Sequence, residues 1–203
     1  MLVLDHLAVL GADLKSAVEH VEGVFDCTMG AGGQHARFGT HNRLMGLCDN
    51  LYLEAIATDP EAPPPQDARW FGLDHFSGPP RLDKWVCRVA DIEAAVAQLP
   101  VEPRIVDVER GDLKWRMLVP TDGFLPFDGL FPALIEWQTP VLPGVALAGQ
   151  DWALTTLTIT HPEASKLHSI LAPYLNDDRI RFETGDTPHI RADFNGPFKC
   201  QLT

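Results

Sequence analysis

The chain has 203 residues, 45% of them hydrophobic and 22% charged, the balance of a globular chain that buries a core. Lys and Arg total 16 against 28 Asp and Glu, and the net charge of −12 argues against a nucleic-acid or anionic-membrane partner. No apolar run approaches the roughly 18 residues of a membrane span. The N-terminal segment has no signal-peptide pattern, and the four scattered cysteines indicate free thiols, so we expect a cytoplasmic protein.

Two segments of the chain repeat each other. Segment 4–21 aligns without gaps with segment 82–99, an offset of 78 positions (82 − 4). Each copy predicts a strand with two-residue alternation and then an amphipathic helix, with Asp13 and Asp91 as N-caps. Six of the 18 aligned pairs are identical, namely Leu4/Leu82, Asp5/Asp83, Ala12/Ala90, Asp13/Asp91, Ala17/Ala95 and Val18/Val96. A repeat of this kind indicates two copies of one structural unit.

Further strands are expected after each helix. They are THNRLMGLC (40–48) and LYLEAIA (51–57) in the first copy, and RIVDVE (104–109), LKWRMLV (113–119) and ALIEW (133–137) in the second. The order is therefore β-α-β-β-β twice, over 1–78 and 79–140. Glu54 and Glu136 stand at equivalent places near the end of each copy.

A third, partial copy is expected over 150–203. LTTLTITHPEASKLHSIL (154–171) predicts a strand and a helix, and RIRFETGD, HIRADF and FKCQLT predict further strands. The Pro- and Gly-rich stretches 60–66 and 139–150 are the expected connections. We predict an α+β fold in which all three parts form one domain, 1–203.

The paired β-α-β-β-β modules, GGQHARFGTHN (32–42) with YLEAIA, and the later KWRM and PALIEW segments carry a family likeness. The chain resembles the vicinal-oxygen-chelate superfamily, and specifically its glyoxalase-like domain family. This resemblance implies that the sheet curls into a cup, with helices outside and the functional site inside. It also implies a divalent metal on the first and last strands of each module.

The resemblance maps the metal positions to His6, Glu54, Lys84 and Glu136. A protonated lysine has no lone pair for a cation, so the implied ligand set is His6, Glu54 and Glu136, suited to Zn, Ni, Mn or Fe. The alternative is that His6 is a hydrogen-bonded wall residue and that Lys84 neutralises Glu136.

Other side chains are candidates for catalysis or substrate binding. His35 and Glu54 are candidate proton-transfer groups, although a loop histidine is more often solvated. Asn42 belongs to the resembling motif and is expected to orient a ligand. The strand 113–119 is expected to turn Trp115 and Met117 toward a helix and Arg116 into the cup. There Arg116 would bind a substrate carboxylate or form a salt bridge with Glu54 or Glu136.

Three functions are open from the sequence. The first is a glyoxalase-like enzyme, a metal-dependent lyase, isomerase or dioxygenase acting on a small carbonyl or carboxylate compound. The second is a metal-free protein that sequesters a small molecule through Lys84 and Arg116. The third is a degenerate module kept for assembly. The partner is expected to be a small molecule, and the chain a monomer or homodimer.

Overall fold

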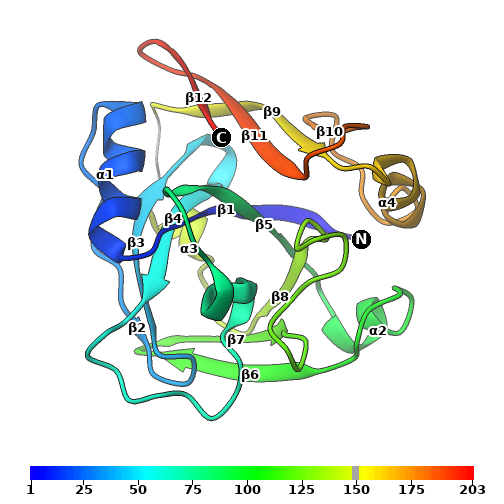
Figure 1. Cartoon of the computed structure of the whole chain (residues 1–203), viewed down its shortest axis with the longest axis horizontal. Helices are drawn as coiled ribbons and strands as arrows, with labels where there is room; N and C mark the ends of the chain where they lie inside the picture. Colours follow the sequence, from blue (N-terminus) through cyan, green and yellow to red (C-terminus); the bar gives the residue numbers. More distant parts are fainter. Residues whose placement is uncertain (148–150) are drawn as a thin grey trace.

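The computed structural model describes residues 1–147 and 151–203, and its elements repeat one order three times (Figure 1). The first unit comprises β1 (Val3–Leu10), α1 (Leu14–Phe25), β2 (Gln34–His35), β3 (Thr40–Gly46) and β4 (Tyr52–Thr58). The second comprises β5 (Arg81–Arg88), α2 (Ile92–Val96), β6 (Ile105–Arg110), β7 (Leu113–Leu118) and β8 (Ala133–Trp137). Both units have the β-α-β-β-β order expected from the repeat.

The first two units build one curled sheet of eight strands in the order β2-β3-β4-β1-β5-β8-β7-β6. The first strand of each unit pairs in parallel with its last, β1 with β4 and β5 with β8, and β1 and β5 join the units antiparallel. The end strands β2 and β6 come into contact, so the sheet is nearly closed. The expected α+β class and cup are confirmed.

The helices begin where the sequence predicts. The side chain of Asp13 accepts from the backbone N–H of Ser16, and that of Asp91 accepts from the N–H of Ala94. These N-caps satisfy backbone donors that the first helical turn leaves free. Helix α1 packs on β3 and β4, and α2 packs on β7 and β8.

The last part of the chain forms a separate four-stranded sheet. It contains β9 (Ala153–Thr160), α4 (Ala164–Leu171), β10 (Ile180–Glu183), β11 (His189–Asn195) and β12 (Lys199–Leu202). The element order is again β-α-β-β-β, but the strand order is β10-β9-β11-β12. Here the first strand pairs with the strand directly after the helix, unlike β1 and β5. The third unit therefore repeats the element order of the others with a different sheet topology.

Short helices occur in several connecting segments. The expected connection 60–66 is followed by η2 (Trp70–His75), and another short helix, η1 (Cys48–Asn50), precedes β4. Helix α3 (Pro143–Leu147) lies in the expected connection 139–150, whose last residues, 148–150, lie outside the described residues.

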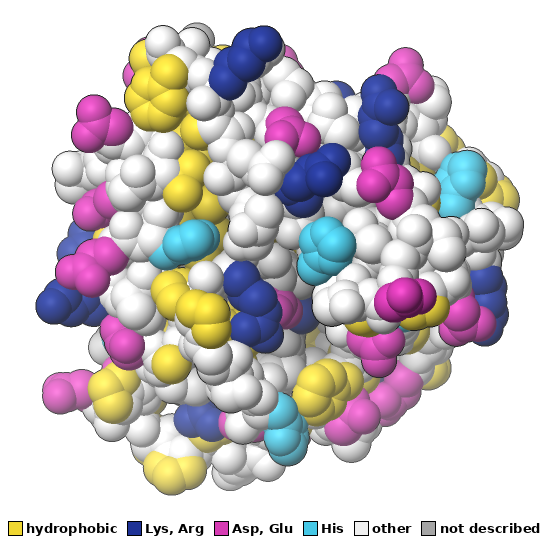
Figure 2. All heavy atoms as spheres, turned by 45° about the horizontal axis from the view of Figure 1, so that its top comes forward, with side chains coloured by type: hydrophobic (Ala, Val, Ile, Leu, Met, Phe, Trp, Pro, Cys, Tyr) yellow, Lys and Arg dark blue, Asp and Glu magenta, His cyan; other side chains and the backbone are white. Residues whose placement is uncertain are grey.

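The surface of the molecule carries charges of both signs. On the face drawn in Figure 2, acidic and basic side chains are interspersed. Among the described residues, no helix combines the length and apolar character that crossing a bilayer requires.

Candidate functional site

A β-bulge places two consecutive side chains of β1 together. In the pairing of β1 with β5, Leu4 faces Cys87 and His6 faces Val86, so Asp5 is an extra residue without a partner. Such a bulge turns the side chain of the extra residue away from its regular direction. The carboxylate of Asp5 lies 2.8 Å from Nδ1 of His6, and both residues are buried.

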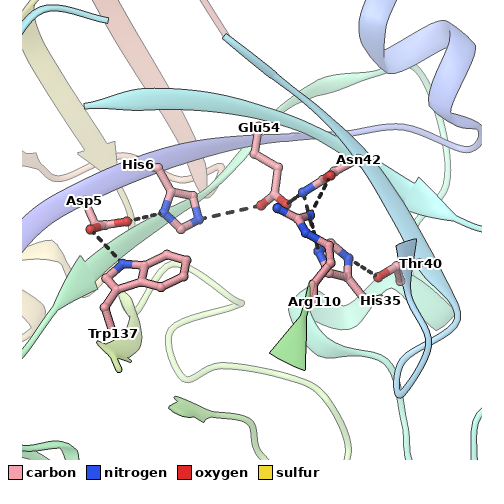
Figure 3. A network of polar contacts seen from close by, with 8 residues as sticks. All are labelled: Asp5, His6, His35, Thr40, Asn42, Glu54, Arg110 and Trp137. Atoms are coloured by element: carbon pink, nitrogen blue, oxygen red, sulfur yellow. Dashed lines mark hydrogen bonds and ion pairs between the residues drawn. The ribbon is translucent and has the colours of Figure 1, made fainter. Parts of the chain in front are cut away.

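Figure 3 shows that His6 is the middle of a polar row that continues to β3 and β4. Nε2 of His6 lies 3.6 Å from a carboxylate oxygen of Glu54, whose other oxygen accepts from the amide of Asn42 at 2.5 Å. Tyr52 stacks on the His6 ring with 4.4 Å between ring centroids. Contacts with Asp5, Tyr52 and Asn42 therefore fix the side chains of His6 and Glu54 in place.

The two carboxylates decide the charge of His6. Burial by itself would lower the pKa of His6, but contacts with Asp5 and Glu54 raise this pKa to about 9. Burial would likewise raise the pKa of Glu54, but His6, His35 and Asn42 lower it to about 2. At neutral pH the cavity therefore contains an imidazolium beside a carboxylate.

His35 is held in the opposite, neutral state. Burial and the charge of Arg110 keep the pKa of His35 low, at about 4. Nη1 of Arg110 lies 3.0 Å from Nε2 of His35, and the Thr40 hydroxyl lies 3.0 Å from Nδ1. Because a guanidinium can only donate, Nε2 of His35 must accept, which leaves the ring proton on Nδ1.

The polar row forms one side of a cavity whose other walls are mainly aromatic and aliphatic. The space between its wall atoms is about 420 Å³, its open mouth included. Its walls come from both units of the large sheet, from η2 and from the first residue of α3. The apolar side chains that line it include Leu44, Trp70, Phe71, Trp115, Met117, Ile135, Trp137 and Pro143.

Four of the predicted site residues meet in this cavity. His6, His35, Asn42 and Glu54 come from β1, β2, β3 and β4 and all line it. The first module therefore supplies the polar side of the site. This placement agrees with the expectation from the motif.

Glu136 and Arg116 lie outside the cup, contrary to expectation. Trp115 and Met117 on β7 line the cavity, so the intervening Arg116 must face outward. Arg116 forms ion pairs with Glu93 and Glu136 there. The expected face assignment of β7 is therefore inverted, because its apolar residues Trp115 and Met117 form the cavity wall and Arg116 pairs with acidic residues on the outer face. The salt bridge between Arg116 and Glu136 is the alternative that the sequence left open.

Glu136 is bonded to the helix beside it. Its carboxylate accepts from the backbone N–H of Ile92 at 2.7 Å, at the start of α2. Its neighbours Ile135 and Trp137 face the cavity instead. The structure therefore places Glu136 on the opposite face from His6 and Glu54, which does not favour the expected shared metal site.

Lys84 is buried but is not among the residues that line the cavity. In the pairing of β5 with β1, Asp83 is an extra residue, as Asp5 is on β1. The ammonium group of Lys84 contacts the carboxylate of Asp83. Burial lowers the pKa of Lys84, and Asp83 opposes this change. The repeat thus preserves both the bulge and its side-chain contact.

The donor set fits a metal poorly. Of the three expected ligands, only His6 and Glu54 face the cavity, and protein sites for the expected metals use at least three. His35 is not a free third donor because its Nε2 accepts from Arg110. Among the described residues, the group that could place three ligands around an ion is Asp91, Glu93 and Glu136. That group lies outside the cup and is already bonded to Arg116 and to the start of α2.

Arg110, Asp5 and Trp137 are among the site residues that the sequence did not reveal. Arg110 follows Val106 and Val108 on alternate positions of β6, so two-residue periodicity already placed it on their buried face. The identity of Asp5 with Asp83 in the repeat pointed to a shared local role. Trp137 donates to Asp5 at 3.2 Å. Nothing in the sequence distinguished Trp137 from the other apolar residues of its strand, such as Ile135.

One protein-family model matches most of the chain. A model of the glyoxalase-like domain family matches residues 4–175, which include both units of the large sheet and the first strand and helix of the third. A search of curated proteins found no match to this chain.

Several solved structures are similar to this chain at low sequence identity. A hypothetical protein from Staphylococcus aureus is 14% identical with a TM-score of 0.62, and the match covers 99% of this chain and 85% of that one. Methylmalonyl-CoA epimerase from Mycobacterium tuberculosis is 20% identical, covering 72% and 92%, with a TM-score of 0.44. A variant of the methylmalonyl-CoA epimerase of Streptomyces coelicolor, in complex with 2-nitronate-propionyl-CoA, is 14% identical, covering 70% and 98%, with a TM-score of 0.45.

Proposed function

Since the chain belongs to the glyoxalase-like domain family, we propose that it binds a small carbonyl or carboxylate compound in the cavity and moves a proton to or from it. The observation that supports this proposal is the buried row Asp5–His6–Glu54–Asn42, placed at the edge of an aromatic cavity. An acid and a base held side by side away from water are suited to proton transfer.

In the proposed reaction, Glu54 and His6 act together on a carbon next to a carbonyl group. The carboxylate of Glu54 takes a proton from this carbon, and the C–H electron pair forms a carbon–carbon double bond. Nε2 of His6 gives its proton to the carbonyl oxygen, so that the product is an enol. Returning both protons regenerates the starting groups and, in heavy water, labels the carbon.

The ligand itself would make Glu54 a better base. In the free protein, His6 and Asn42 hold the pKa of Glu54 at about 2, too low for efficient proton abstraction at neutral pH. A compound that enters between Glu54 and His6 would weaken their attraction and exclude water, and both changes raise the pKa of the carboxylate.

Neighbouring side chains would position these two groups. Asp5 holds the proton on Nδ1 of His6 and so directs Nε2 toward the cavity. The bond from Arg110 occupies Nε2 of His35, which favours a positioning role for His35 over the proton-transfer role expected from sequence. The proposed reaction uses no metal, since only two of the expected ligands face the cavity.

A second candidate is a protein that sequesters a small molecule without converting it. The low pKa of Glu54 favours this candidate, because a carboxylate locked in an ion pair is structural rather than basic. Lys84 and Arg116 would not be its binding groups, since they lie outside the cavity-lining set.

Deuterium uptake separates the two candidates. Pyruvate, methylglyoxal and phenylpyruvate would be incubated with protein dialysed against EDTA in D2O, and exchange at the carbon beside the carbonyl followed by NMR. We expect catalysed exchange for at least one compound, reduced about 100-fold or more in Glu54→Gln. Glu136→Gln is the matched control and should retain the native rate. Binding in the cavity without catalysed exchange for any of the three compounds would exclude the proposed reaction and support sequestration.

A further inference from the structure

Arg110 reaches across the closing seam of the curled sheet. It is the last residue of β6, and its Nη1 donates to His35 on β2 and to Oδ1 of Asn42 on β3, each at 3.0 Å. Gly33 makes room for it, since a Cβ there would lie 2.6 Å from Cδ of Arg110. Figure 3 shows the guanidinium reaching His35 and Asn42.

This guanidinium has no carboxylate partner. Within residues 1–147 and 151–203, every other arginine or lysine that is buried or half-buried forms an ion pair with Asp or Glu. Arg110 bonds only to neutral side chains in this part of the chain, His35 and Asn42. Glu54, the one carboxylate among the described residues that line the cavity, is paired with His6 and bonded to Asn42.

An unpaired cation in a partly buried place is unfavourable unless something supplies the opposite charge. The protein has 28 Asp and Glu residues against 16 Lys and Arg. A shortage of acidic residues therefore does not explain why Arg110 has no carboxylate partner among the described residues. Nη1 is already bonded, and the remaining N–H groups of the guanidinium can donate to two oxygens of one anion.

The surroundings select the kind of anion. Trp70 and Trp115, whose rings both lie against His35, form the apolar walls near Arg110. No second arginine or lysine lines the cavity in the described residues. A phosphate group carries up to two charges and three acceptor oxygens and needs several donors. A single guanidinium among apolar walls suits a carboxylate.

We infer that Arg110 is the carboxylate-binding residue of the cavity and that the ligand is a small carboxylic acid whose apolar part lies against the tryptophans. This inference rests on the proposed function because it concerns the same cavity. It transfers to Arg110 the role that the sequence suggested for Arg116.

The test compares acids with matched amides. Affinities for acetate, benzoate and phenylacetate, for their three amides and for inorganic phosphate would be measured by calorimetry and by quenching of tryptophan fluorescence. We expect at least one acid to bind 10-fold or more tightly than its amide, and phosphate to bind weakly. In Arg110→Gln this preference should fall to less than 3-fold, while affinity for the amide stays the same. Arg116→Gln, on the outer face, should keep the native preference.

Two further variants keep the test decisive if Arg110→Gln does not fold. Arg110→Lys keeps the charge without the planar fork and should retain part of the preference. Gly33→Ala displaces the Arg110 side chain without removing it and should weaken binding of the acid more than of the amide. No acid preferred over its amide, or a full preference in folded Arg110→Gln, would overturn the inference. Acid binding without deuterium exchange would instead reject only the proposed reaction.

Discussion

At the scale of single residues, the cavity holds two histidines in opposite charge states. His6 lies between the carboxylates of Asp5 and Glu54, which raise its pKa to about 9. His35 is buried beside Arg110, and its pKa is lowered to about 4. Both values move away from the ordinary value of about 6.5, so both histidines couple the stability of the fold to pH.

The direction of this coupling differs between the two histidines. A raised pKa stabilises the fold below about pH 6.5, and this contribution is lost as pH rises through about 9. A lowered pKa stabilises the fold above about pH 6.5, and this contribution is lost as pH falls through about 4. We therefore predict that His6→Gln flattens the alkaline fall of the unfolding free energy between about pH 6.5 and 9.

Urea unfolding between pH 5 and 9.5 would measure this effect. Each unit of pKa shift corresponds to about 1.4 kcal/mol, so the loss in the native protein should amount to a few kcal/mol at most. His35→Asn is the complementary control and should alter only the acid side. Parallel pH curves for native protein and His6→Gln would show that His6 is not held as an imidazolium.

At the scale of elements, the site depends on the approach of the β2 segment to β3. Gly32 lies against β3, and a Cβ there would lie 1.8 Å from the carbonyl oxygen of Asn42. The neighbouring Gly33 donates its N–H to Oδ1 of Asn42 at 2.8 Å. The glycines of the resembling motif thus allow the backbone to pack beside Asn42, which in turn bonds to Glu54.

Gly32→Ala should therefore disturb the site as well as the fold. The clash is with backbone and cannot be relieved by turning a side chain, so we expect a loss of stability of about 2 kcal/mol or more. Ligand affinity should fall with it. Gly23→Ala, in the last turn of α1 with nothing within 4 Å of its added Cβ, is the matched control and should stabilise by up to about 1 kcal/mol. Thermal unfolding and calorimetry of both variants would decide, and equal stability would contradict the predicted clash.

At the scale of the whole molecule, the two sheets share an aromatic contact. Phe25 at the end of α1 packs edge-on against Trp152 and Phe194, with 5.0 Å between ring centroids in both pairs. Backbone bonds add to it, from Cys48 to Trp152 and from Leu82 to Thr203. The C-terminal sheet therefore packs on the same helix that covers the first module.

We predict that both sheets unfold in a single transition, as expected for one domain. Phe25→Ala should lower the unfolding free energy by about 3–5 kcal/mol and shift the whole transition. Phe124→Ala, at a residue 44% exposed, should have a much smaller effect. Calorimetry together with limited proteolysis would check this prediction. Two transitions, only one of them sensitive to Phe25, would show that the C-terminal sheet folds independently.

The sequence by itself determined the modular plan, because a repeat, alternating apolar residues and N-cap aspartates are local signals. The resemblance to the glyoxalase-like family also implied that His6, His35, Asn42 and Glu54 belong to one site. Only the tertiary structure decided which face of β7 and β8 looks into the cup. Alternation separates Trp115, Met117, Ile135 and Trp137 from Arg116 and Glu136, but it does not say which set faces the cavity, because apolar walls and an ion pair occur both in ligand sites and beneath helices. It likewise decided that Arg110 lacks a carboxylate among the described residues, since ion pairing depends on the strands that meet when the sheet closes.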